Sequence, residues 1–141
     1  MSNFLDLLND VLLEQNKDIK YLEKQGILPE RAFYQYKDYT PYLSTIIKIA
    51  NCLKISIDYL ADRRSENNFV PYKLLQTNFY YNLLAILKDR KISQSKFSKD
   101  LLLDSSNFTY WKQGKRPKLE TLIKIADYLS CNIDDLLDRE D

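Results

Sequence analysis

The 141-residue chain is 45% hydrophobic, 13% aromatic and 29% charged, a composition that is typical of a globular protein and excludes a disordered one. Its formal net charge of +1 does not by itself indicate a nucleic-acid partner, so charge has to be examined locally. The chain holds only two Gly, four Pro and no His, which disfavours an all-β fold and excludes histidine as a general base or zinc ligand.

The cysteines and the hydropathy pattern both bear on the compartment. Cys52 and Cys131 stand alone in separate apolar stretches, which predicts two buried thiols in a reducing compartment rather than a disulfide framework. The segment Met1–Asn9 lacks the basic and apolar parts of a signal peptide, and no apolar stretch approaches the ~18 residues of a membrane span. We therefore expect a soluble, cytoplasmic protein with no membrane partner.

A first unit is predicted over residues 1–63. Its first helix is capped by Ser2 and carries a stripe of buried leucines at Leu5, Leu8 and Leu12. Gly26 is predicted to form the turn after a second helix, and Pro29 to lie near the start of a third. The fourth helix has a 3.6-residue apolar period made by Leu43, Ile46, Ile47, Ala50 and Leu53.

Residues 64–77 are predicted to link the first unit to the second. The start of this segment, Arg64–Asn68, is polar and is typical of a linker. The remainder is too apolar for a free tether, so we expect Phe69–Leu75 to pack on a domain.

The second unit is predicted over residues 78–141 as five helices. The N-caps of the first, second, third and fifth helices are assigned to short polar residues, namely Asn78, Ser93, Asp104 and Asn132. The third helix buries Phe108 and Trp111 and ends at Gly114, and Pro117 opens the fourth. The apolar period of the fourth helix is made by Leu119, Leu122, Ile123, Ala126 and Leu129.

The chain repeats itself at an offset of 76 residues. Pro41–Arg63 and Pro117–Arg139 are identical at 13 of 23 positions. Unrelated helices share apolar positions, but these two stretches also share polar ones, including Thr45 with Thr121 and Asp58 with Asp134. We interpret the repeat as the duplication of one all-α domain.

The second unit contains six short sequence motifs in a fixed order along the chain. They are Ser93-Gln94, Phe97-Ser98, Asp104–Gln113, Gly114-Lys115-Arg116-Pro117, Leu119–Leu129 and Asp134–Leu137. In this order they resemble the Cro/repressor (XRE-type) helix-turn-helix family. The resemblance implies an all-α chain of two tandem five-helix lambda-repressor-like helix-turn-helix domains, of which the first is degenerate because Lys17-Asp18 stands in place of the Ser-Gln pair. Leu102 departs from the family, which usually has Gly there, so we expect the turn to adapt and to permit a tilt of the third helix.

A helix that reads the major groove offers short polar side chains near its N-terminus. The third helix of the second unit supplies five candidates for base contacts, which are Ser105, Ser106, Asn107, Thr109 and Tyr110. Phosphate contacts are expected from the start of the second helix and from the basic residues that end or follow the third, which are Gln94, Lys112, Lys115, Arg116 and Lys118.

Local charge separates the two units. The window Lys88–Lys118 holds nine basic and three acidic residues, a balance of +6, whereas Leu12–Tyr42 holds five of each. DNA affinity comes largely from cations placed against phosphates. The charge balance therefore predicts that the second unit binds double-stranded DNA, and it gives no such indication for the first unit. Pro29-Glu30 stands where base-reading residues of the first unit would begin, which favours the same conclusion.

These features predict a sequence-specific transcription regulator, with repression as the expected sign, that needs no cofactor or metal. The alternative is a protein-interaction module of helix-turn-helix origin, antitoxin-like or inhibitor-binding, which would use the aromatic segment Phe33, Tyr34, Tyr36, Tyr39 and Tyr42 of the first unit. An enzyme is not expected, since no Gly-rich phosphate loop or carboxylate cluster accompanies the lack of histidine. We expect a homodimer joined through the first unit and Phe69–Leu75, while a single-chain pseudo-dimer with both units on DNA stays open.

Overall fold

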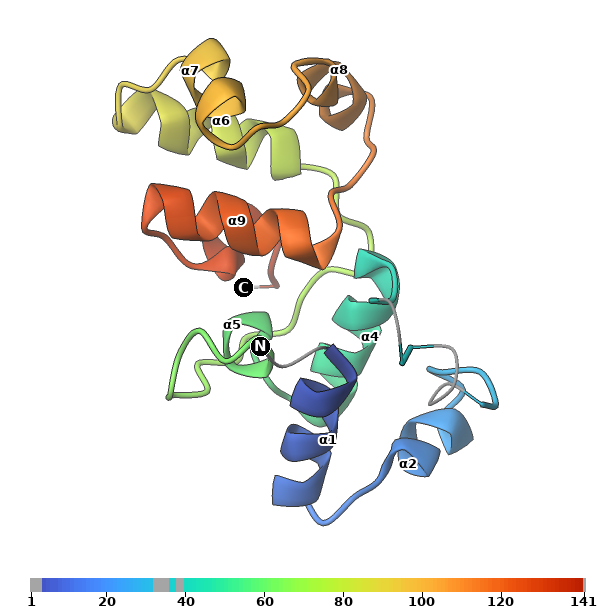
Figure 1. Ribbon diagram of the computed structural model, residues 1–141. Coiled ribbons are helices and arrows are strands. Elements are labelled where there is room, and N and C mark those ends of the chain that lie inside the picture. Colours follow the sequence, from blue (N-terminus) through green and yellow to red (C-terminus); the bar gives the residue numbers. More distant parts are fainter. Residues whose placement is uncertain (1–3, 32–35, 38–39, 141) are drawn as a thin grey trace. The chain divides into compact units, whose positions relative to one another are not determined.

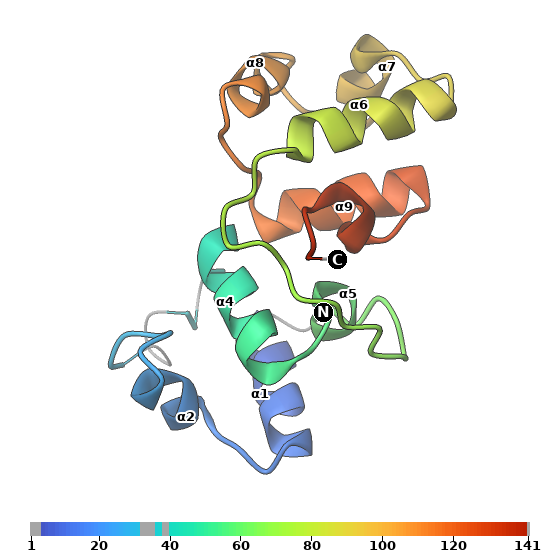
Figure 2. The ribbon, with the colours of Figure 1, turned by 180° about the vertical axis from the view of Figure 1, so that it is seen from behind.

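The computed structural model describes residues 4–31, 36–37 and 40–140, and over these ranges it consists of helices and their connections (Figure 1; Figure 2 gives the opposite view). The all-α character predicted from the sequence is therefore confirmed for the described residues. The chain divides into two compact units, one extending to Leu74 and the other running from Leu75 to Glu140. No helix within the described ranges has the length and apolar character needed to cross a bilayer.

The described helices of the first unit are α1 (Phe4–Glu14), α2 (Ile19–Lys24), α4 (Leu43–Leu53) and α5 (Ile57–Leu60). Helix α5 packs against both α1 and α4. The predicted stripes are buried, with Leu8 of α1 and Ile46 and Ile47 of α4 fully inaccessible to solvent. The predicted cap at Ser2 lies outside the described residues.

The chain between α2 and α4 is described only in part. Gly26 forms the expected turn, with φ +73° and its N–H donated to the Glu23 carbonyl at 3.0 Å. Pro29, Glu30 and Arg31 are not helical, and Arg31 has φ +65°, which a right-handed helix does not allow. Residues 32–35, where the predicted third helix would continue, lie outside the described residues.

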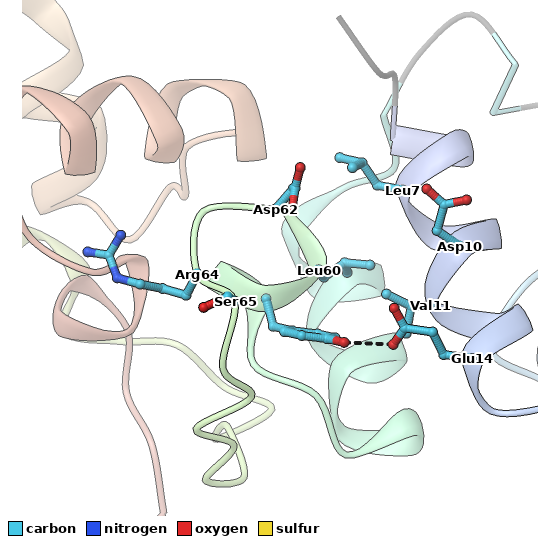
Figure 3. Close-up of a pocket in the computed structure, with 9 residues that line it drawn as sticks. Leu7, Asp10, Val11, Glu14, Leu60, Asp62, Arg64 and Ser65 are labelled. Carbon is cyan, nitrogen blue, oxygen red and sulfur yellow. Dashed lines mark hydrogen bonds between the residues drawn. The ribbon is translucent and has the colours of Figure 1, made fainter.

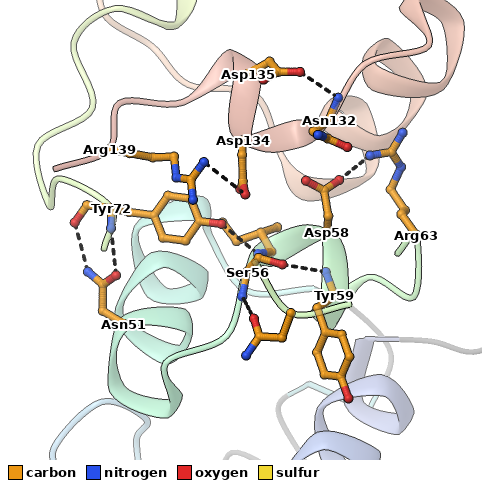
Figure 4. Close-up of polar contacts among 12 residues, drawn as sticks. Asn51, Ser56, Asp58, Tyr59, Arg63, Tyr72, Asn132, Asp134, Asp135 and Arg139 are labelled. Atoms are coloured by element: carbon orange, nitrogen blue, oxygen red, sulfur yellow. Dashed lines mark hydrogen bonds and ion pairs between the residues drawn. The ribbon is translucent and has the colours of Figure 1, made fainter. Parts of the chain in front are cut away.

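The segment predicted as a linker is held on the first unit by two asparagine side chains (Figure 4). Asn51 Nδ2 donates to the Tyr72 carbonyl at 3.0 Å, and the Tyr72 N–H donates to Asn51 Oδ1 at 2.9 Å. Asn67 Oδ1 accepts the Ser56 N–H at 2.8 Å, and Asn67 Nδ2 donates to the Lys54 carbonyl at 2.9 Å. Residues up to Tyr72 are thus bound to the first unit and are not a free polar tether, contrary to the interpretation of Arg64–Asn68.

The second unit consists of α6 (Phe79–Asp89), α7 (Gln94–Asp100), α8 (Ser106–Lys112), α9 (Leu119–Leu129) and the 3₁₀ helix η1 (Ile133–Leu136). Helix α6 packs against α8 and η1, and η1 packs against α9. The predicted start of α9 at Pro117 is two residues early, because Lys118 is still extended (ψ 163°) and serves as the N-cap of a helix that begins at Leu119. The fifth predicted helix is a 3₁₀ turn with Asn132 at its N-cap position, where the Asn132 N–H donates to Asp135 Oδ2 at 3.0 Å.

Local geometry repeats at the same offset of 76 residues as the sequence. Helix α4 matches α9 residue for residue, and α5 matches η1. Both longer helices end at a left-handed residue, Lys54 with φ 55° and Ser130 with φ 52°. In each unit an arginine then pairs with an aspartate of the short helix, Arg63 with Asp58 and Arg139 with Asp134, the latter at 3.6 Å (Figure 4). The two repeated stretches therefore place their helices and helix ends at equivalent positions, although the short helix is α-helical in the first and 3₁₀ in the second.

Candidate nucleic-acid interface

Helix α7 is fixed at its start by Ser93, whose Oγ accepts the Lys96 N–H at 3.0 Å. This is the cap that the sequence predicts. Phe97 and Ser98 form the buried face of the helix, and Phe97 is fully inaccessible to solvent. Gln94, the first helical residue, is exposed, so its amide is available to a ligand.

The turn after α7 retains left-handed geometry although it lacks glycine. Leu102 has φ +55° and donates its N–H to the Lys99 carbonyl at 3.2 Å, and the Leu103 N–H reaches the Ser98 carbonyl at 2.9 Å. The Leu102 side chain is 91% exposed, so no packing holds it there. The turn therefore holds a leucine in the left-handed conformation, which costs free energy for any residue other than glycine.

The start of α8 differs from the predicted one by a single residue. Ser105 is the N-cap and makes no side-chain capping bond; instead Asp104 Oδ1 accepts the Ser106 N–H at 2.9 Å. Asp104 therefore supplies the capping oxygen from one position further out, and its hydrogen bonds from Ser106, first through the backbone and then through the side chain, lower the pKa of Asp104. Asn107 Nδ2 donates to the Asp104 carbonyl at 2.9 Å, which orients the Asn107 side chain.

Helix α8 is clearly two-faced. Phe108 and Trp111 are buried, with ring centroids 5.3 Å apart, and Trp111 also meets Phe79 of α6 edge-on at 5.2 Å. The predicted base-reading residues lie on the accessible side, where Ser105, Ser106, Thr109 and Tyr110 are exposed and Asn107 is half-buried. The aromatic contacts fix the inner face of α8 and leave short polar groups pointing away from the core.

Basic residues lie at the end of α8 and in the loop that follows it. Lys112, Lys115 and Lys118 are exposed, and Arg116 is half-buried. Gly114 has φ +98°, the left-handed conformation expected after a helix end. Lys115 Nζ lies 4.6 Å from the centroid of the Tyr110 ring, a cation–π contact that sequence reasoning missed because it spans the helix end.

This arrangement is a short capped helix, a tight turn, a second helix with an exposed polar face and a basic loop. Residues 82–141 match the family model of the Cro/C1-type HTH DNA-binding domain. Comparisons with curated proteins and with solved structures found no match. The family match supports the resemblance of the second unit to XRE-type proteins and makes this unit a DNA-binding candidate.

In the second unit, α7 is tied to α9 by a polar network that the sequence analysis did not predict. Tyr128 of α9 donates its hydroxyl to Asp100 Oδ2 at 2.5 Å, and Lys96 Nζ lies 3.1 Å from the same oxygen. The hydrogen bond from Tyr128 and then that from Lys96 lower the pKa of Asp100, while the bond to Asp100 raises the pKa of Tyr128. Lys96 is thus engaged by Asp100 and is not a free cation of the basic window.

The end of the second unit is also hydrogen-bonded to residues that precede the family match, which begins at residue 82. Gln76 is 3% exposed and exchanges two side-chain hydrogen bonds with the backbone of Asp138. Its carbonyl accepts the Arg116 Nε–H at 3.1 Å. Only spatial proximity reveals these bonds, since they join residues 62 and 40 positions apart.

The first unit offers a different surface. Between α1 and α5 lies a pocket of about 290 Å³ (Figure 3), where Tyr59 donates its hydroxyl to Glu14 Oε2 at 2.6 Å, and this hydrogen bond raises the pKa of Tyr59. Asp10 and Asp62 also line the pocket, with Arg64 as a cation. Because carboxylates repel phosphates, this pocket does not favour a DNA surface.

The aromatic segment of the first unit is described only in part. Tyr36 is buried and Tyr42 is 78% exposed. Phe33, Tyr34 and Tyr39 lie outside the described residues. Of the two described tyrosines of this segment, only Tyr42 is therefore accessible to a protein partner.

Proposed function

We propose that the second unit binds double-stranded DNA in a sequence-specific manner and that α8 enters the major groove. The observation that carries the proposal is the division of α8 into a buried aromatic face and an exposed polar face, within residues that match a DNA-binding family. Short polar side chains at the start of such a helix are suited to base edges. Ser105, Ser106, Asn107 and Thr109 are the proposed base-reading residues, and Tyr110 is a weaker candidate because it carries Lys115 on its ring.

Phosphate binding is assigned to the groups that flank α8. Gln94, Lys112, Lys115 and Lys118 are exposed, and Arg116 completes the set. Cations in such positions hold the backbone on either side of a groove and set the orientation of the reading helix. We infer that the protein is a transcription regulator, and repression by occupation of its DNA site is the simplest outcome.

For the first unit we propose common descent with the second and the loss of its DNA surface. The support is the repeat itself, which extends to helix ends and to the Asp58–Arg63 and Asp134–Arg139 pairs. We propose that both domains extend beyond the predicted limits of 1–63 and 78–141, because Asn67 and Tyr72 are hydrogen-bonded to the first unit and Gln76 to the second. A pairing role fits this unit, so we propose a homodimer joined through it and through the connection, whose Leu74 and Leu75 are 64% and 68% exposed.

Two measurements on the full chain test the DNA-binding proposal. Affinity for duplex DNA should fall steeply as salt rises, with a slope of about 0.9 for each phosphate neutralised. Selection from random duplexes should then return a consensus, which Ser105→Ala and Asn107→Ala change by weakening one contact of about 1–3 kcal/mol each. Ser44→Ala, an exposed serine of the first unit, is the matched control. Salt-independent binding, or an unchanged consensus in both α8 variants, contradicts the assignment.

The dimer is tested by sedimentation of the full chain and by the stoichiometry of its complex. We expect a dimer at micromolar concentration and two chains per selected site. A monomer that binds its site one-to-one favours the single-chain pseudo-dimer, in which both units contact DNA.

A further inference from the structure

The chain that leads into α6 is locked to the end of the second unit. Gln76 Nε2 donates to the Asp138 carbonyl at 2.8 Å, and the Asp138 N–H donates to Gln76 Oε1 at 2.7 Å. The Asp138 carboxylate accepts the N–H groups of Thr77 at 2.9 Å and Asn78 at 3.0 Å through the same oxygen, Oδ2. Four hydrogen bonds thus fix the backbone at Gln76, where the side chain is almost fully buried.

This fixed backbone holds an arginine of the proposed interface. Arg116 lies in the loop after α8 and donates its Nε–H to the Gln76 carbonyl at 3.1 Å. A guanidinium is planar, so a bond at Nε also sets the direction of the two terminal nitrogens. Within the described ranges the structure records no other polar partner for Arg116, and its neighbours Lys115 and Lys118 are exposed.

We propose that Gln76 is a positioning residue of the DNA interface, which holds Arg116 through its carbonyl so that the two terminal nitrogens bind one DNA phosphate. The inference rests on the proposed function of the second unit. A guanidinium that is already oriented loses less conformational freedom on binding than a free one, and two parallel N–H bonds suit a phosphate. Gln76 lies before residue 82, so the DNA surface depends on a residue outside the family match.

The test measures how the affinity of the full chain for a mixed-sequence 20-base-pair duplex depends on salt. Gln76→Met keeps the length of the side chain but removes its donor and its amide oxygen. Arg116→Ala removes the guanidinium and should lower the salt slope by roughly one. If Gln76 acts through Arg116, Gln76→Met lowers the slope by a similar amount, and the double variant loses no more than Arg116→Ala alone.

A matched control exists in the first unit. Asn51 exchanges the same kind of paired hydrogen bonds with the backbone of Tyr72, so Asn51→Leu removes a comparable lock and should leave the slope unchanged. Arg116→Lys tests the geometry without touching Gln76, because lysine keeps the charge but lacks the Nε–H. It should behave like Arg116→Ala, whereas a wild-type slope would show that charge alone matters and overturn the inference.

The two proposals fail in different ways. A wild-type chain that does not bind the duplex overturns the proposed function, and the positioning role of Gln76 with it. Wild-type binding combined with an unmoved slope in Gln76→Met, or with losses that add in the double variant, overturns only the role of Gln76. If Gln76→Met does not fold, as judged by its circular dichroism, the Arg116→Lys result decides alone.

Discussion

Leu102 and Gly26 lie 76 residues apart and share the left-handed backbone conformation, with φ values of +55° and +73°. Each donates its N–H to the carbonyl three residues earlier, Lys99 and Glu23 respectively, at 3.2 and 3.0 Å. The two turns therefore have the same geometry, but only the first has the residue that adopts it without strain. The strained residue Leu102 therefore lies between α7 and α8, the two helices of the proposed DNA-binding motif.

Leu102→Gly should stabilise the second unit by about 0.5–1 kcal/mol. Relief of a left-handed non-glycine residue, about 1–2 kcal/mol, outweighs the added freedom of glycine in the unfolded chain. Little packing is lost because the side chain is 91% exposed. Urea unfolding measures the change, and Leu102→Ala, which keeps the Cβ, should be close to neutral. An equal gain from both variants would assign the effect to the exposed leucine and not to the backbone.

Tyr110 should act through its ring rather than its hydroxyl. Its ring carries the Lys115 ammonium at 4.6 Å, so Tyr110→Phe keeps the contact and Tyr110→Leu removes it. We expect Tyr110→Phe to bind DNA like the wild type with the same consensus, and Tyr110→Leu to bind all sequences several-fold more weakly. A consensus altered by Tyr110→Phe would instead establish a base contact through the hydroxyl.

Acid should weaken the second unit partly through Asp138. Partial burial acts to raise its pKa, but hydrogen bonds from the N–H groups of Thr77 and Asn78 and from the side chains of Asn78 and Asn82 prevail and hold the pKa of Asp138 below the ordinary 3.8. A carboxylate whose pKa is lower in the folded than in the unfolded state stabilises the fold. Its contribution is complete at pH values above the unfolded-state pKa and is lost as the pH falls through the folded-state pKa.

The measurement is the urea midpoint at pH 7, 4 and 3 for the wild type and Asp138→Asn. The variant should be less stable at pH 7 and should lose less on acidification below pH ~4. Asp100 and Asp104 also have lowered pKa values, so the variant keeps some acid sensitivity. Parallel loss in the two proteins would exclude Asp138 as a source of the acid response.

Trp111 should carry much of the stability of the second unit. It is 6% exposed and meets Phe79 and Phe108 edge-on, so Trp111→Ala removes two aromatic contacts and leaves a cavity. We expect a loss of about 3–5 kcal/mol in the free energy of unfolding. Native emission of this single tryptophan should be blue-shifted relative to the unfolded chain. Emission typical of water-exposed indole would contradict the buried position.

The local elements of the second unit were largely predictable from the sequence. The cap at Ser93, the buried pair Phe108 and Trp111, and the left-handed Gly114 depend on residues only a few positions apart. Helix starts were less exact, because two adjacent polar residues, Asp104 and Ser105, compete to cap α8.

Long-range polar bonds were beyond sequence reasoning. The side-chain amides of Asn51 and Asn67 form hydrogen bonds with the backbone around the connection, and that of Gln76 does so with Asp138. In the sequence, these amides cannot be told apart from ordinary solvated side chains. The Tyr128–Asp100 bond likewise depends on how α9 packs beside α7. No periodicity or spacing encodes such pairs, so the residues that orient the candidate site emerged only from the fold.

The hydrogen bonds between residues 76–78 and Asp138 also determine where a fragment that contains the second unit can begin. A fragment that starts at residue 82, the first residue of the family match, would leave the Asp138 carboxylate without the N–H groups of Thr77 and Asn78. It would also strip Phe79 from Trp111 and expose that indole to water. A fragment that starts at Leu75 retains all of these groups, so we expect the smallest fragment of the second unit that folds alone to be longer than the stretch that matches the family model.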